Sequence, residues 1–157
     1  MPIPDFIVEL RAMVGHHPLW LPGVTAVVRR QDEVLLVRRS DNGAWTPVTG
    51  IPEPGEEPAV AAVREVLEEA GVTAQVDRLA SCSVHGPITH ANGDLATYLD
   101  LTFACTWVAG EPYVADDEST AVAWVHRDDL VLRRMSEEML RRIEAALSDE
   151  LATRFIR

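Results

Sequence analysis

The chain has 157 residues, with 14 Lys and Arg against 25 Asp and Glu, so its formal charge is 14 − 25 = −11, and 47% of its residues are hydrophobic. This length and apolar fraction predict one globular domain over residues 1–157 and exclude a disordered chain. The excess of negative charge excludes proteins that bind nucleic acid backbones or an anionic membrane through a basic face.

The first predicted element is a short N-terminal helix. Asp5 is expected to cap this helix and Gly15 to end it. Apolar residues recur at helical spacing between these two positions: Phe6, Leu10, Met13 and Val14.

The same N-terminal segment carries charged residues where a signal peptide would be apolar, and no run approaches the roughly 18 apolar residues of a membrane span. The two cysteines, Cys82 and Cys105, are too few for a disulfide framework and are expected to be small buried side chains. We therefore expect a cytoplasmic protein with no membrane partner.

After the N-terminal helix, the pattern changes to strands. Apolar, β-branched runs at 23–29 and 33–38 flank Arg30-Gln31-Asp32 and predict a β-hairpin. A short strand is expected at 45–49. A Pro- and Gly-rich loop then leads into a helix over 58–70, which has a proline in its first turn and Gly71 as its stop.

The second half of the chain predicts more strands and a closing helix. Strands are expected at 75–84, 96–108 and 121–125, the first two separated by a polar loop with the turn dipeptide Asn92-Gly93. From Ser136 onward, apolar residues at helical spacing predict an amphipathic helix. This order of elements predicts an α/β sandwich with a mixed sheet.

The chemistry is concentrated in the helix over 58–70. Helical geometry places Glu65, Glu68 and Glu69 on one face and Val63, Val66, Leu67 and Ala70 on the other. Like charges at positions i and i+4 destabilise a helix, and a divalent cation reverses that effect. Oxygen ligands without His or Cys favour Mg²⁺ or Mn²⁺ over zinc. The alternative is an acidic helix face that is merely solvated.

The full spacing favours the metal site. Gly50 is followed after five residues by Glu56, and after seven more by Arg64-Glu65-Val66-Leu67-Glu68-Glu69-Ala70-Gly71-Val72. This segment resembles the Nudix box at every defining position. The resemblance implies the Nudix fold, which is an α/β/α sandwich around a mixed β-sheet. It also implies hydrolysis of a nucleoside diphosphate linked to another moiety, with Mg²⁺ or Mn²⁺.

The resemblance also assigns roles to residues of this chain. Glu65, Glu68 and Glu69 match metal-binding carboxylates, and the carbonyl of Thr49, before Gly50, matches a further ligand. Arg64 and Glu56 match residues that orient the carboxylates, and Gly50 and Gly71 match structural positions of the box. The chain departs from the family at Pro47-Val48-Thr49, where many members read Leu-Pro-Gly, which leaves the effect on the loop undetermined.

A further acid is expected near this site. Glu118 follows Asp116 and Asp117 at a place where similar proteins often carry an additional metal-binding or general-base glutamate; the alternative is a solvated acidic loop. Glu118, Glu68 and Glu65 all remain candidates for the base that positions the attacking water.

Four other residues are candidates for substrate binding. The resemblance places Arg38 and Arg39 on the substrate side, with exposed strand-end charges as the alternative. Trp45 is a candidate for stacking on a base, with core packing as the alternative. His90, in a polar loop with His85, is a candidate for lining the mouth of the site, with a solvated loop as the alternative.

The substrate is the least determined part of the prediction. Pro87 lies where family members that hydrolyse ADP-ribose often have a proline, which slightly favours an ADP-ribose-like substrate. A nucleoside triphosphate, including a damaged nucleotide, is one alternative, and a Nudix-fold sensor that binds a nucleotide without hydrolysis is another. The resemblance is compatible with a homodimer, although the sequence contains no interface signature.

Overall fold

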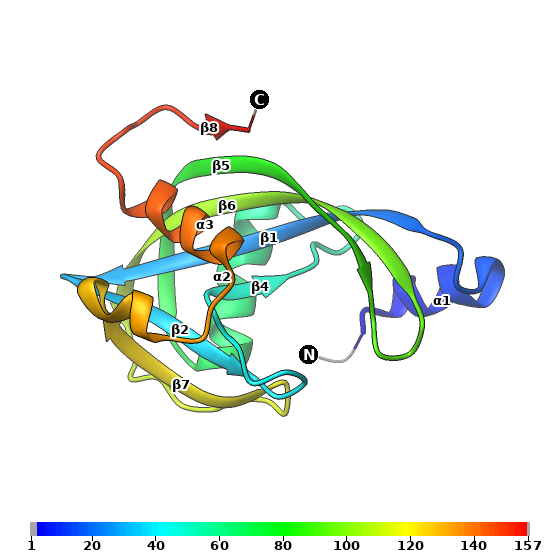
Figure 1. The fold of residues 1–157 in the computed structure, drawn as a ribbon, viewed down its shortest axis with the longest axis horizontal. Helices are drawn as coiled ribbons and strands as arrows, with labels where there is room; N and C mark the ends of the chain where they lie inside the picture. Colours follow the sequence, from blue (N-terminus) through cyan, green and yellow to red (C-terminus); the bar gives the residue numbers. More distant parts are fainter. Residues whose placement is uncertain (1–2, 157) are drawn as a thin grey trace.

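The computed structural model describes residues 3–156, which form a mixed β-sheet between two helical layers (Figure 1). The elements are α1 (Asp5–Val14), β1 (Leu19–Arg30), β2 (Glu33–Arg39), β3 (Trp45–Thr46), β4 (Val48–Gly50), α2 (Pro58–Ala70), β5 (Thr73–Thr89), β6 (Leu95–Ala109), β7 (Ser119–His126), the 3₁₀-helix η1 (Arg127–Leu132), α3 (Glu137–Leu147) and β8 (Arg154–Phe155). The predicted α/β/α sandwich is confirmed.

The strands of the sheet run in the order β3-β2-β1-β6-β5-β8, with β4 paired to β1 and β7 paired to β2. The predicted hairpin forms, but β1 and β2 pair only near its tip, from Arg29 opposite Val34 to Arg30 opposite Glu33. Further along, β2 pairs with β7 instead, and β1 accepts β4, which sets Thr25 opposite Thr49. The divergence of β1 and β2 therefore admits the strand that carries Thr49 and Gly50.

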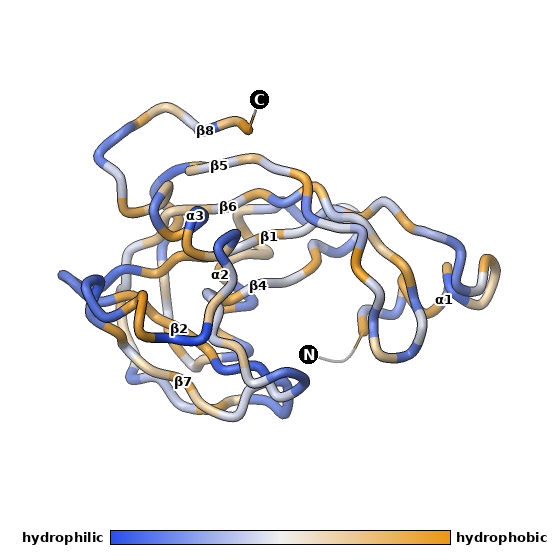
Figure 2. Tube along the Cα trace, viewed as in Figure 1, coloured by the Kyte–Doolittle hydropathy of each residue, from blue (hydrophilic) through white to orange (hydrophobic). Residues whose placement is uncertain are grey.

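Alternate residues of the central strands point to opposite faces of the sheet, as strand geometry requires. Leu35 and Val37 pack into the core on the α2 side, with Ala61, Ala62, Val66 and Ala70 of the helix. Val34 and Leu36 pack on the other side, with Ile143 of α3. The turn between β1 and β2, which contacts neither core, is hydrophilic (Figure 2).

The N-terminal helix forms where predicted, but its predicted cap is wrong. Pro4 occupies the N-cap position, and Asp5 is the first helical residue and makes no capping hydrogen bond. Of the apolar residues of the helix, Met13 and Val14 are exposed, whereas Ile7 is buried against Leu21 and Ala96. The reason is that α1 lies at one end of the sheet (Figure 1), so only one side of the helix has a surface to pack on.

Strand lengths and short elements also differ from the predictions. β5 continues through His85 and Pro87, which were expected in a loop, because β6 pairs with it up to Thr89. The run at 45–49 is divided into β3 and β4 at Pro47, which lacks the backbone N–H that a continuous strand would use. η1 and β8 were not predicted. Cys105 is buried as expected, but Cys82 is only half-buried.

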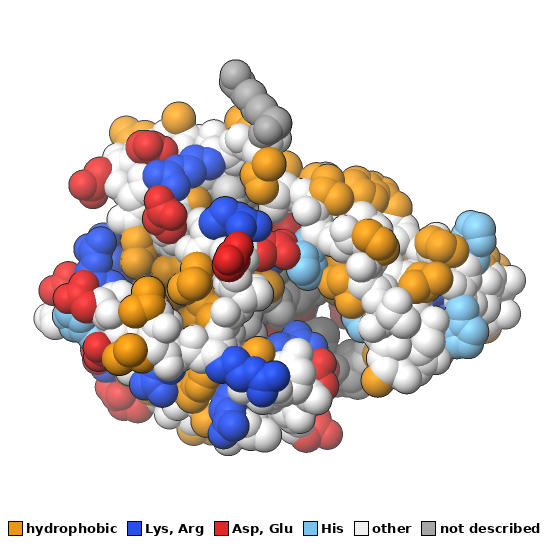
Figure 3. Space-filling view, viewed as in Figure 1, with side chains coloured by type: hydrophobic (Ala, Val, Ile, Leu, Met, Phe, Trp, Pro, Cys, Tyr) orange, Lys and Arg blue, Asp and Glu red, His pale blue; other side chains and the backbone are white. Residues whose placement is uncertain are grey.

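No helix of the described residues 3–156 is long and apolar enough to cross a membrane. The expected homodimer stays a prediction. Figure 3 shows hydrophobic side chains on the surface where β5 and β6 extend beyond the helices, and Val84 and Leu99 are exposed on these strands. Nothing among the described residues identifies what covers them.

One buried charge network joins α3 to the sheet. The Arg142 guanidinium, which is almost completely buried, donates to Asp100 (2.9 Å), Thr25 (2.8 Å) and Glu138 (2.6 Å). Asp100 also accepts from the hydroxyls of Thr25 and Thr102. Burial raises the pKa of Asp100 although Arg142 opposes the shift.

We expect Arg142→Met to lower the free energy of unfolding by about 3–5 kcal/mol, because it leaves the Asp100 carboxylate buried without its cation. The matched control is Arg141→Met. Arg141 is exposed and pairs with Glu137 at 4.0 Å, so its loss should cost less than about 0.5 kcal/mol. Urea denaturation of both variants measures the difference, and equal values would contradict a stabilising role for the network.

Candidate active site on helix α2

Local sequence signals define both ends of α2. Pro58 stands in the first turn, where its missing N–H costs nothing, and Gly71 ends the helix in the left-handed conformation at φ 66°. The helix therefore spans the predicted residues, and the acidic half of the box lies in its last two turns. The sequence did not predict which side chains of this half of the helix face the protein interior.

The predicted acidic face is turned partly into the protein. Glu65 and Glu69 are only 1% and 5% exposed, whereas Leu67, expected in the core, is 55% exposed. Glu68 remains on the surface. The buried side of α2 thus combines small apolar residues with two carboxylates, so the helix is rotated relative to the expected orientation.

Gly50 explains why Glu65 can be buried. A Cβ atom placed on Gly50 would lie 2.2 Å from both Cδ and Oε1 of Glu65. The carboxylate therefore lies directly against the backbone of β4, beside Thr49. Any residue other than glycine at position 50 would clash with it. This contact is the structural reason for glycine at the start of the box in this chain.

Arg64 connects the acids of the box. Its guanidinium donates to both oxygens of Glu56 at 2.8 Å, to Glu65 at 3.1 Å and to Glu68 at 3.0 Å. The hydrogen bonds from Arg64 lower the pKa of Glu56, which also accepts from the backbone N–H of Glu53. The structure thus brings together Arg64 and three carboxylates, an arrangement in which Arg64 orients its partners.

The two buried carboxylates have unusual proton affinities. Burial is the main cause that raises the pKa of Glu65 to about 7, against the opposing effect of Arg64. Burial also raises the pKa of Glu69 to about 8, with Glu65, Asp116 and Glu118 adding repulsion. The raised pKa values show that the ionised forms of these two acids lack enough nearby positive charge to stabilise them.

The chain between β6 and β7 borders the same end of α2. The backbone N–H of Ala115 donates to the Glu69 carbonyl at 3.3 Å, and the carboxylates of Asp116 and Glu118 act on Glu69 electrostatically. Arg39 pairs with Asp41 (2.6 Å), and this hydrogen bond, with smaller effects of Glu118 and Glu69, raises the pKa of Arg39. Glu118 and Arg39 therefore both act electrostatically on Glu69, and Arg39 lies in the ladder opposite Ser119, the residue after Glu118.

The other predicted substrate-binding residues are not in contact with this group. Arg38 is exposed and donates to the Gly43 carbonyl. Trp45 packs into the core on the α3 side, with the Arg133 guanidinium 5.1 Å from its ring. His90 shares a hydrogen bond with the Tyr98 hydroxyl at the β5–β6 turn, which lies near α1 (Figure 1).

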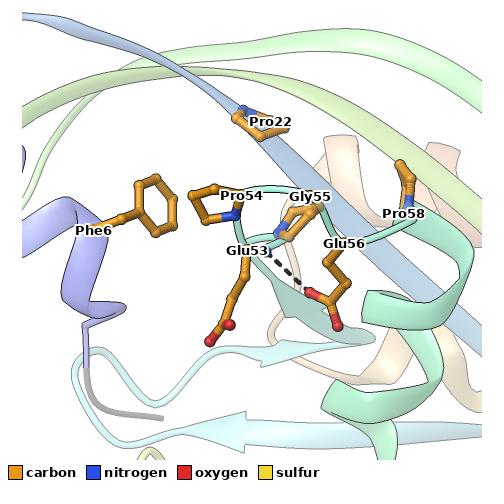
Figure 4. A pocket seen from close by; sticks show the side chains of 8 residues that line it. Phe6, Pro22, Glu53, Pro54, Gly55, Glu56 and Pro58 are labelled. Atoms are coloured by element: carbon orange, nitrogen blue, oxygen red, sulfur yellow. Dashed lines mark hydrogen bonds between the residues drawn. The ribbon is translucent and has the colours of Figure 1, made fainter.

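A cavity of about 360 Å³ lies between α1 and the Pro- and Gly-rich loop that precedes α2. Figure 4 shows Phe6 and Pro54 on one side of it and Pro22 above it, with the Glu56 carboxylate directed away from Pro22. Its walls are mainly proline and phenylalanine. Two acids of the box segment line the cavity, Glu53 and Glu56, and Glu56 is the one that is bound to Arg64.

The donors of the box fit a hard divalent cation. All are oxygen atoms, and Oε2 of Glu65 is buried without a hydrogen-bond partner, which is the kind of atom that a cation satisfies. Among residues 3–156, no three His, Cys, Asp or Glu side chains already converge as a complete metal cluster. Glu68 is instead turned to Arg64.

Sequence reasoning missed two residues of this region. Asp41 holds Arg39, and Tyr113 lies against Gly71 at the end of α2. Asp41 follows Arg39 by two positions, which is a signal visible in the sequence. Tyr113 has no such signal, because it meets Gly71 only through the fold.

Comparisons with known proteins identify the family of the chain. A family model for the NUDIX domain matches residues 19–146. A MutT-like protein of Streptomyces ambofaciens is 36% identical over 131 residues, which are 83% of this chain and 79% of that protein. The chain therefore belongs to the Nudix hydrolase family, whose members hydrolyse pyrophosphate bonds of nucleotide derivatives.

Solved structures share the fold. A NUDIX hydrolase from Nitrosomonas europaea is 29% identical with a TM-score of 0.68, over 81% of this chain and 88% of that one. An ADP-ribose pyrophosphatase from Streptococcus suis is 26% identical with a TM-score of 0.62, over 87% and 98%. Other curated relatives are longer. The NAD-capped RNA hydrolase of Stutzerimonas stutzeri is 32% identical over 119 residues. The aligned region covers 74% of this chain but only 40% of that protein.

We expect the metal-free chain to lose stability as the pH rises. Glu65 and Glu69 have a usual pKa of 4.5, against about 7 and about 8 in the folded chain. The folded state therefore binds more protons than the unfolded state over this interval, and the free energy of unfolding falls as the pH rises from about 5 to about 8. Added Mg²⁺ should raise Tm more at the upper end, because it binds the ionised form.

The measurement is Tm in EDTA and in Mg²⁺ across this interval. The control is the double variant Glu65→Gln/Glu69→Gln, which should show a flatter pH dependence and a smaller response to Mg²⁺. An unchanged slope in the double variant would show that other groups cause the pH dependence.

Proposed function

We propose that the chain is a metal-dependent pyrophosphohydrolase that cleaves a nucleoside diphosphate linked to another moiety, with an ADP-ribose-like molecule as the favoured substrate. The observation that carries the proposal is the complete box folded around Gly50, with the unpartnered Oε2 of Glu65 buried beside it. Mg²⁺ or Mn²⁺ is the proposed cofactor. The proposed partner is a small nucleotide substrate, with no nucleic acid or membrane.

The residues of the site take distinct roles in this proposal. Glu65, Glu68, Glu69 and the Thr49 carbonyl would hold the cation, with Glu118 as an additional ligand. When bound, the cation would neutralise phosphate oxygens and lower the pKa of the attacking water. Arg64 holds Glu65 and Glu68 in place through its hydrogen bonds.

The general base is proposed among the exposed acids. A base must reach the attacking water, and Glu65 is almost completely enclosed, whereas Glu68 and Glu118 are exposed. This difference favours Glu68 or Glu118 over Glu65. Arg39, whose charge interacts with those of Glu69 and Glu118, is the proposed contact for a phosphate oxygen.

One comparison supports an ADP-ribose-like substrate: the ADP-ribose pyrophosphatase of Streptococcus suis has the same fold over most of both chains. The resemblance adds Pro87, a proline at the position where family members that hydrolyse ADP-ribose often have one. A cytoplasmic location is also proposed, supported by the two free cysteines, because thiols persist in a reducing compartment.

Glu69→Gln should lower kcat at saturating Mg²⁺ by about two orders of magnitude or more, because it removes a cation-binding charge while keeping the shape of the side chain. The matched control is Glu57→Gln, an exposed acid at the N-cap of α2 whose side chain makes no capping hydrogen bond. The control should retain normal kcat. Normal turnover of Glu69→Gln, with Tm equal to that of the parent, would exclude Glu69 from the metal site.

The substrate class is tested by a hydrolysis panel with Mg²⁺ and with Mn²⁺. The panel contains ADP-ribose, dinucleotides, sugar nucleotides, CDP-alcohols and nucleoside triphosphates, with AMP and phosphate release as readouts. We expect AMP from ADP-ribose. Preferential hydrolysis of a triphosphate would contradict the proposed substrate class, and binding of a nucleotide without hydrolysis of any would identify a sensor.

A further inference from the structure

The segment 110–118, between β6 and β7, is attached to the C-terminal end of α2 by its backbone. The N–H of Tyr113 donates to the Ala70 carbonyl at 3.1 Å, and the N–H of Ala115 donates to the Glu69 carbonyl at 3.3 Å. The last carbonyls of a helix have no partner within the helix. Segment 110–118 therefore supplies partners for the carbonyl groups of the turn that contains Glu69.

The Tyr113 ring fixes this attachment. A Cβ atom on Gly71 would lie 2.0 Å from Cε1 and 2.6 Å from Cδ1 of Tyr113, so the ring lies directly on the glycine. Gly71 has φ 66° and ends the helix. A side chain at position 71 would push the ring away, so glycine here serves both the helix end and the tyrosine contact.

The start of the segment approaches the same place. A Cβ atom on Gly110 would lie 2.8 Å from the Gly71 carbonyl oxygen. The Gly110 carbonyl in turn accepts a hydrogen bond from Nε1 of Trp107 at 2.9 Å. The segment is thus held at Gly110 and again at Tyr113 before it reaches its acidic residues.

The acidic end of the segment is also constrained. The backbone N–H of Glu118 donates to the Asp116 carboxylate at 3.1 Å, and the Glu118 carbonyl accepts from the N–H of Ser40 at 2.7 Å. Between Tyr113 and this point the chain has only a few residues in which to change direction. The position of Tyr113 on α2 therefore limits where Asp116 and Glu118 can lie relative to Glu69.

We propose that Tyr113 is a positioning residue whose contact with Gly71 sets the placement of Asp116 and Glu118 beside the carboxylates of α2 and so completes the cation site. The inference rests on the proposed function in one respect, because it takes this site to bind a divalent cation. Tyr113 itself touches neither the cation nor the substrate in this account. It acts through the backbone of segment 110–118.

Burial of the tyrosine does not explain the contact. The side chain is 61% exposed, so little of its apolar area is removed from water. Its contact with Gly71 involves the ring atoms Cδ1, Cε1 and Cζ at the end of the helix. Loss of the ring should therefore change the position of the segment more than it changes global stability.

The test compares Tyr113→Ala with Tyr113→Phe, which keeps the ring, and with Val114→Ala, which removes an exposed neighbouring side chain of the same segment. Mn²⁺ binding is measured by electron paramagnetic resonance on the full chain without nucleotide. We expect Tyr113→Ala to weaken Mn²⁺ binding by about tenfold or more, the range seen when residues supporting metal ligands are lost. Tyr113→Phe and Val114→Ala should bind Mn²⁺ as the parent does.

Combination with Asp116→Asn/Glu118→Gln separates positioning from a general structural effect. If Tyr113 acts by placing these two carboxylates, the triple variant should bind Mn²⁺ about as weakly as Asp116→Asn/Glu118→Gln alone. Multiplication of the two losses would overturn the proposal. Parental Mn²⁺ affinity in Tyr113→Ala, or an equal loss in Tyr113→Phe, would overturn it as well.

Hydrogen exchange gives a readout independent of both metal and hydrolysis. The amides of Tyr113 and Ala115 should exchange faster in Tyr113→Ala, while those of β6 keep their protection; unchanged exchange at these two amides would overturn the inference. Failure of the proposed function has a different signature. It would show as absence of hydrolysis across the nucleotide panel by the parent chain, with the Mn²⁺ and exchange differences among the variants retained.

Discussion

The contact between the Glu65 carboxylate and the backbone of Gly50 is the constraint on which the rest of the site depends. It requires a strand, β4, to run directly beneath α2, and it requires that strand to carry no side chain at one position. The sheet meets this requirement by letting β2 leave β1 after a short pairing, so that β4 takes the free edge of β1. The rotation of α2 toward the sheet, with Leu67 outside and Glu69 inside, follows from the same contact.

Burial of Glu65 and Glu69 opposes folding, since each carboxylate loses its hydration without gaining a full set of partners. Arg64 compensates part of this cost for Glu65, and it is itself neutralised by Glu56 and Glu68. A protein selected for stability alone would place apolar residues at these positions. The network of Arg142 and Asp100 on the other face of the sheet differs in kind, because its buried charges are paired with each other and with hydroxyl groups.

The sequence predicted most of the architecture because its signals are local. Pro58 and Gly71 delimit α2, Ser136 caps α3, and the continuous apolar run of β2 matches its burial on both faces. The resemblance assigned Arg64 and Glu56 to orient the other carboxylates, and the structure pairs them with each other. The burial of Glu65 was not predictable from helical periodicity, which orders residues around the axis but does not say which sector faces the sheet. Tyr113 was not predictable because its contact joins residues far apart in the chain. For Trp45, core packing was the alternative to stacking on a base, and core packing is what the structure has.

The pairing of β2 with β7 has a consequence for charge around the site. Arg39 ends β2 opposite Ser119, the first residue of β7, and Glu118 directly precedes Ser119. The cationic and the anionic group thus both lie at one end of the two-stranded ribbon of β2 and β7. This ribbon pairs with β1 only at the tip of the β1–β2 hairpin. Because Leu35 and Val37 of this ribbon pack with α2 in one core, the same packing that orders the helix also fixes the placement of both charged groups relative to its carboxylates.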